Sequence, residues 1–187
     1  MSSQQPFNQL TGVLQVYLAP YGTAVPAVTG APSGSWVLLG PTDGEQVAEH
    51  KGALTFFRDN DNQGPVKSVR PEEDFSITFT VVGLSMTNLA KIWSAAANLA
   101  TAGNIQTLGL ERGFLPTEYA LIFRGETISP AGAYPAQYVL PRCVFDGEPA
   151  ATFAKDGRPG LECVVTAIVD PAQSAGFKLG WLVAQVS

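Results

Sequence analysis

The chain has 187 residues, of which 45% are hydrophobic and 14% charged, a charged share well below the roughly 25% of an average soluble domain. It can therefore bury a sizeable core within one ordinary domain, and this composition argues against intrinsic disorder. The formal net charge of −5 argues against a dedicated nucleic-acid-binding protein, whose affinity comes from basic residues that neutralise phosphates.

The first third of the chain predicts short strands separated by turns. Residues 13–18 alternate weakly and predict a strand, residues 20–34 form a loop rich in Pro and Gly, and residues 36–39 are a short apolar run. Residues 53–58 predict another strand. The charged segment before it, around the single histidine His50, predicts a solvated loop.

A turn-forming stretch follows, because Asn, Asp and Gly tolerate left-handed backbone and Pro removes a donor. We expect it to be a long loop that orders only on assembly, since its residues bury little. Its members are Asp59, Asn60, Asp61, Asn62, Gln63, Gly64 and Pro65.

The clearest strand is residues 74–82, in which apolar and polar side chains alternate with the period of a half-buried strand. The apolar set is Phe75, Ile77, Phe79 and Val81. The polar set is Asp74, Ser76, Thr78 and Thr80.

A helix is predicted over residues 87–99, because apolar residues recur there at helical spacing. That spacing is set by Leu89, Ile92, Trp93 and Ala96. Ser85 or Thr87 can cap its first amides, and an alanine run favours the helix further along.

Four more strands are predicted at residues 118–124, 136–145, 150–154 and 160–169, with a hairpin signal at residues 155–158. In the last of them, one face carries Leu161, Cys163, Val165, Ala167 and Val169. The other face is mixed and carries Glu162, Val164, Thr166 and Ile168. The segment 171–187 is an apolar arm that needs a partner surface, its own or a neighbour's; its large side chains are Phe177, Leu179, Trp181, Leu182 and Val183.

No constellation of residues predicts catalysis, a metal or a cofactor. There is one histidine and no G-x-S-x-G motif, and Lys67-Ser68 lacks the preceding glycine of a phosphate loop. The neighbouring carboxylates at residues 59–61 and 72–74 are expected to be solvated, and Cys143 and Cys163 to be buried thiols. No apolar run is long enough for a membrane span. We therefore expect a protein that is not an enzyme.

The order of these segments resembles that of the major tail proteins, the tail tube subunits of long-tailed phages with non-contractile tails. The strand that opens at Thr11, the Gly-Pro-Val-Lys segment and the acidic alternating strand carry the resemblance in the first half. The corresponding segments are residues 11–23, 36–44, 64–70, 72–80, 87–91, 138–145, 155–157 and 167–170.

The resemblance implies a mainly β fold, a β-sandwich or barrel of the tail-tube type flanked by one helix. It implies one domain over residues 1–187 with an N-terminal arm, 1–12, and a C-terminal arm, 171–187. Six subunits would form a ring, and stacked rings would form a tube through which the genome passes into the host. The tube would assemble in the host cytoplasm and become part of the virion tail, without contact with a membrane.

The resemblance also assigns roles to segments and partners. The loop 59–65 would reach a neighbouring subunit. The resemblance covers residues 11–170; that the two arms join rings is our expectation from their composition, since residues 1–12 are polar and residues 177–183 are apolar. The strand 74–82 would line the lumen with its polar face, joined by Glu162 and Thr166. The partners would be further copies of the chain and other tail proteins, namely tape measure, terminator and distal tail proteins. DNA would pass without specific binding, as expected for an acidic wall that repels phosphate.

Two other readings agree with the same residues. A β-sandwich module that binds carbohydrate or acts as an adhesin explains the strands and aromatic residues equally well, but it does not predict self-assembly. The tube protein of a contractile injection system would share the architecture and have a surrounding sheath.

Overall fold

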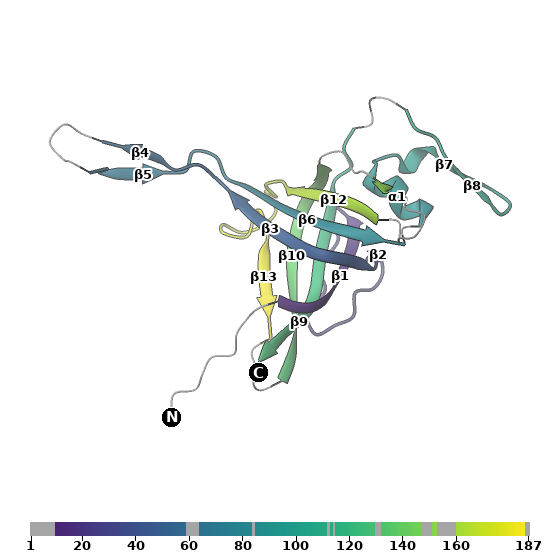
Figure 1. The fold of residues 1–187 in the computed structure, drawn as a ribbon, viewed down its shortest axis with the longest axis horizontal. Coiled ribbons are helices and arrows are strands. Elements are labelled where there is room, and N and C mark those ends of the chain that lie inside the picture. The colour runs from purple at the N-terminus through teal and green to yellow at the C-terminus, as the bar shows by residue number, and fades with distance from the viewer. Residues whose placement is uncertain are drawn as a thin grey trace.

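The computed structural model describes residues 10–58, 64–83, 85–111, 113, 115–129, 132–146, 151–152 and 160–185. The fold is mainly β with one α-helix, which confirms the expected fold class. A large antiparallel sheet forms the centre of the molecule (Figure 1). The β4–β5 hairpin (Thr55–Phe57 and Lys67–Val69) projects from one end of it, and the β7–β8 hairpin (Leu99–Ala102 and Ile105–Leu108) projects on the opposite side, next to the α-helix.

The described elements follow one another mostly through short connections. In the first half they are β1 (Leu10–Pro20), β2 (Val37–Gly40), β3 (Thr42–Lys51), β4 (Thr55–Phe57), β5 (Lys67–Val69), β6 (Asp74–Val82) and α1 (Met86–Ile92). In the second half they are a 3-10 turn (Ala96–Asn98), β7 (Leu99–Ala102), β8 (Ile105–Leu108), β9 (Tyr119–Ser129), β10 (Gly132–Asp146), β11 (Ala151–Thr152), β12 (Gly160–Ala167) and β13 (Trp181–Ala184).

The main sheet curls until its two ends meet. Its strand order is β2-β1-β9-β10-β12-β6-β3, with β11 added to β12 and β13 added to β10. The end strands β2 and β3 are consecutive in the chain and are separated only by Pro41. The Val82 amide at the end of β6 donates to the Pro41 carbonyl at 2.8 Å, which extends the β3–β6 pairing into the residue that links the two end strands.

The core fills the inside of this curl. Phe79 of β6 and Phe123 of β9 meet edge to face, with ring centroids 5.1 Å apart, and both are buried. The apolar positions expected in the strand 74–82 are buried at Ile77, Phe79 and Val81. The alternation expected in residues 161–169 is confirmed at the buried Leu161, Cys163, Val165 and Ala167. It is wrong at Val169, which is 53% exposed because β12 ends at Ala167.

The helix is shorter than its sequence predicts. Ser85 caps α1 through a hydrogen bond from the Asn88 amide, but the helix ends at Ile92 rather than continuing to Leu99. Ser94 has φ 54°, in the left-handed region that interrupts a right-handed helix. The alanine run therefore begins a 3-10 turn, and Ala95 is buried in place of the expected Ala96.

The loop predicted around His50 is wrong, because β3 occupies that segment. This strand pairs with β6 at Thr42 and Asp43 and again over residues 47–51 after an irregularity, with His50 opposite Phe75 and Lys51 opposite Asp74. Most of its side chains are exposed. Because β3 lies at the edge of the sheet, it carries few of the apolar residues by which a strand is recognised in a sequence.

The Pro- and Gly-rich segment of residues 21–36 covers the outer side of β1 and β9. Trp36 packs there with Ala19, Ala120 and Ile122 in a second, smaller core. Arg124 donates to the carbonyls of Ala27 and Gly30. The Gln137 side-chain amide, itself buried, donates to the Pro26 carbonyl at 3.0 Å. Two polar side chains of the sheet thus fix a loop that has no regular structure.

Candidate functional site

The six residues expected to line a lumen share one face of the main sheet. In the antiparallel register, Glu162 of β12 lies opposite Thr80 of β6, and Thr166 lies opposite Ser76. Residues that pair directly across a ladder point to the same face. Asp74 and Thr78 are on this face by the alternation of β6. We call the face formed by β3, β6, β12 and the end of β10 the polar face.

Exposure varies along the polar face. Asp74 and Glu162 are exposed, whereas Thr78, Thr80 and Thr166 are half-buried. Ser76 is only 8% exposed. The two carboxylates are therefore the expected lumenal residues that meet solvent most fully.

The polar face is predominantly acidic. The strand register places three further carboxylates on the same face as Asp74 and Glu162. They are Asp43 and Glu49 of β3 and Asp146 of β10. Asp146 accepts a hydrogen bond from the Thr166 hydroxyl at 3.1 Å. Lys51 of β3 also lies on this face, and its ammonium pairs with Glu49 at 2.8 Å. A surface of this kind repels polyanions at low ionic strength.

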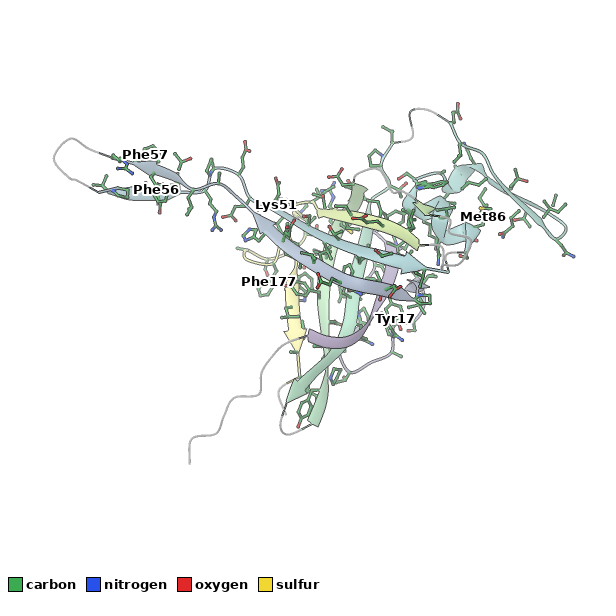
Figure 2. The ribbon with its side chains drawn as sticks, in the orientation of Figure 1. Tyr17, Lys51, Phe56, Phe57, Met86 and Phe177 are labelled. Carbon is green, nitrogen blue, oxygen red and sulfur yellow. The ribbon has the colours of Figure 1, made fainter. Side chains whose placement is uncertain are left out.

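The β4–β5 ribbon extends beyond the ends of β3 and β6, well away from the main sheet (Figure 1). Gly52 lets the two chain segments approach closely at the base of the ribbon, because a Cβ at this position would lie only 2.9 Å from the Glu72 carbonyl oxygen. Phe56 and Phe57 are neighbours in β4 and point to opposite sides of the ribbon, yet they are 52% and 51% exposed (Figure 2). Leu54 and Val66 are also exposed.

The ribbon leads to the loop expected to act in assembly. Gly64 and Pro65 are exposed, whereas Asp59, Asn60, Asp61, Asn62 and Gln63 lie outside the described residues. The first nine residues of the N-terminal arm also lie outside them, and Leu10 and Thr11 pair with β9.

The C-terminal arm lies partly on its own sheet. β13 pairs with β10, and Trp181 lies opposite Val139. Gly180 makes this approach feasible, because its φ is 154° and a Cβ would lie 2.7 Å from the Val139 carbonyl oxygen. Of the five apolar arm residues, Leu179, Trp181 and Val183 are half-buried. Phe177 and Leu182 remain 48% and 43% exposed.

A buried carboxylate holds the start of this arm. Asp170 accepts hydrogen bonds from the Tyr21 hydroxyl at 2.8 Å, the Ala172 amide and the Gln173 side chain. Burial alone would raise the pKa of Asp170, but these bonds and the nearby Arg142 outweigh burial and lower it. Arg142 forms a two-pronged pair with Glu118, at 2.6 and 3.0 Å. This pair lowers the pKa of Glu118.

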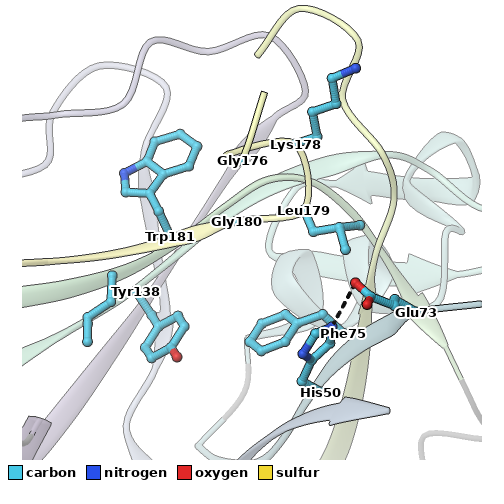
Figure 3. Close-up of a pocket in the computed structure, with 10 residues that line it drawn as sticks. His50, Glu73, Phe75, Tyr138, Gly176, Lys178, Leu179, Gly180 and Trp181 are labelled. Carbon is cyan, nitrogen blue, oxygen red and sulfur yellow. Dashed lines mark ion pairs between the residues drawn. The ribbon is translucent and has the colours of Figure 1, made fainter. Parts of the chain in front are cut away.

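A pocket of about 500 Å³ lies between the C-terminal arm and the ends of β3 and β6 (Figure 3). Phe75 and Tyr138 stack in it, with ring centroids 5.9 Å apart and planes inclined by 15°. His50 Nε2 and Glu73 Oε2 are 3.5 Å apart at its edge. Leu179 and Trp181 line the side formed by the arm.

Sequence reasoning did not identify this pocket. Its residues come from β3, the start of β6, β10 and the arm, and only the sheet register brings them together. The one available signal was the set of aromatic residues near the ends of strands, which core packing explains equally well.

The described ranges contain no group of three or more His, Cys, Asp or Glu residues placed to hold a metal ion. The two thiols, Cys143 and Cys163, are both fully buried, as expected. Burial, and then the Glu162 carboxylate, raise the pKa of Cys163 to about 12. Burial likewise raises the pKa of Cys143 far above its ordinary value. Neither thiol is therefore a nucleophile at neutral pH.

Among the described residues, no helix is both long and apolar enough to cross a membrane. Comparison of the chain with models of protein families and with curated proteins finds no match.

Proposed function

We propose that this chain is a structural virion protein, the tail tube subunit of a phage with a long non-contractile tail. In this proposal it forms hexameric rings that stack into a tube for passage of the genome. It assembles with further copies and with other tail proteins in the host cytoplasm. Catalysis plays no part in this role.

The observation that carries the proposal is the exposed β4–β5 ribbon. A two-stranded ribbon is at best marginally stable in water by itself, and this one exposes Leu54, Phe56, Phe57 and Val66. Burying one large apolar side chain contributes roughly 1.5–3 kcal/mol. A ribbon with apolar residues on both sides suits insertion between other subunits.

The polar face supports the second part of the proposal, a channel for DNA. Exposed carboxylates at Asp74 and Glu162 stand among small hydroxyl side chains. These residues include neither the aromatic rings on which bases stack nor the arginine side chains that bind base edges. A wall of this kind lets a polyanion pass without retaining it.

Electron microscopy of the purified protein tests the proposal. Rings with six-fold symmetry, or hollow filaments of uniform width built from them, are the expected result. Monodisperse monomers at all concentrations and salt conditions would contradict it and favour a β-sandwich binding module. A sheath around the tube in particles from infected cells would favour a contractile system.

A further inference from the structure

The pocket beside the C-terminal arm lies apart from the acidic carboxylates of the polar face. His50 and Phe75 pair across β3 and β6, and both point to the opposite side of the sheet from Ser76 and Thr78. Ligand binding in the pocket therefore does not involve the carboxylates of the polar face. Its volume of about 500 Å³ falls within the roughly 300–1,000 Å³ usual for small-molecule sites.

The apolar part of the pocket is built on an aromatic platform, the stacked pair Phe75 and Tyr138. The rings of Phe75 and Tyr138 stack on each other, with centroids 5.9 Å apart and planes inclined by 15°, and both line the pocket. Leu179 and Trp181 line the side formed by the arm. Such a surface favours a ligand with a flat face made of C–H groups or of a ring.

The polar part of the pocket has unused hydrogen-bonding capacity. The 3.5 Å between His50 and Glu73 and the 3.9 Å between Arg70 and Glu73 exceed the 2.7–3.2 Å of a normal N–H···O bond. The Glu73 carboxylate can therefore still accept. Within the described residues, the Tyr138 hydroxyl and the Lys178 ammonium, both in the pocket lining, form no hydrogen bond.

These two parts narrow the class of ligand. A purely apolar ligand would leave the polar groups unpaired, which costs free energy on binding. The pocket lining carries one carboxylate, Glu73, and one ammonium, Lys178, so a neutral ligand meets no excess of either charge there. A neutral pyranose has an apolar C–H face for the platform and hydroxyls that both donate and accept. We propose that this pocket binds a neutral sugar ring, such as one residue of a surface glycan.

Ligand-observed NMR with five methyl pyranosides (glucose, galactose, mannose, rhamnose and N-acetylglucosamine) tests the proposal, with adenosine as a comparison. At least one glycoside should show saturable binding to the native protein. Tyr138→Ala and Glu73→Gln should each weaken it by roughly tenfold or more, the size of effect expected when a stacked ring or a charged hydrogen bond is lost.

Two variants make the result interpretable. Glu73 is nearly half exposed, so Glu73→Gln reports on binding even if Tyr138→Ala fails to fold. Tyr17→Ala, a tyrosine of β1 that bonds to Gln15, is the matched control and should bind as the native protein does. Absence of saturable binding by all five glycosides, binding of adenosine alone, or binding unchanged in Glu73→Gln would each overturn the proposal.

Discussion

At the scale of single residues, a group of polar contacts joins the end of β1 to the start of the C-terminal arm. Tyr21 follows β1 and bonds to Asp170, which precedes the C-terminal arm. The Arg142 guanidinium lies over the Tyr21 ring, 5.2 Å from its centroid. One buried carboxylate therefore links β1, β10 and the arm, and its charge state should control how firmly the arm is held.

This arrangement predicts a loss of stability in acid. The pKa values of Asp170 and Glu118 are lower in the folded protein than their ordinary values. Their contribution is therefore complete above the unfolded pKa values, about 4, and is lost as pH falls through the folded values. Asp170→Asn should lower the melting temperature at neutral pH, and the difference from the native protein should shrink below about pH 4.

Thermal unfolding followed by circular dichroism from neutral to acidic pH measures this difference. Glu111→Gln, which changes an exposed carboxylate, should leave the curve unchanged. A constant difference between Asp170→Asn and the native protein across the whole pH range would show that the charge of Asp170 is not what holds the arm.

At the scale of elements, the β4–β5 ribbon should matter for assembly and not for folding. Phe56→Ser combined with Phe57→Ser removes apolar area that the monomer leaves exposed. The free energy of unfolding should therefore change by no more than about 0.5 kcal/mol. Ring or tube formation should be strongly impaired, because burial of two such side chains is lost.

Sedimentation and electron microscopy compare this variant with Phe56→Leu combined with Phe57→Leu, which keeps the apolar character. The leucine variant should assemble. If the serine variant formed tubes as readily as the native protein, the ribbon could not be an assembly contact.

The elements also show what a sequence can predict. The strand 74–82 is confirmed with the same bounds, because one of its faces is buried and the other is polar, which produces a clear alternation. β3 was missed because an edge strand with exposed side chains has no such alternation. The predicted helix was too long because the left-handed backbone of Ser94 is a local choice that helix propensity does not encode. The pocket needed the sheet register, which depends on contacts between distant segments.

At the scale of the whole molecule, the acidic polar face should determine how the assembled protein treats DNA. Asp74→Lys combined with Glu162→Lys reverses two exposed charges. Fold and tube should remain intact, since exposed charges contribute little to stability. The variant tube should retain DNA and slow its ejection, and salt should relieve the defect because it screens phosphate attraction.

Ejection rates at low and high salt measure this effect, with Glu111→Lys as the control for a charge reversal outside the polar face. An unchanged rate in the double variant, or a defect insensitive to salt, would indicate that these carboxylates only keep an outer surface soluble.

The two buried thiols have a practical consequence. Cys143 and Cys163 are fully covered, and their pKa values are raised, so thiol reagents react slowly with the folded chain. A cysteine introduced on the surface would therefore react selectively, and the two native cysteines would not have to be replaced first. Ser68→Cys, on the exposed β5 strand, would carry a single fluorophore on the projecting ribbon. The labelled chain would then report, in real time, when the ribbon leaves water.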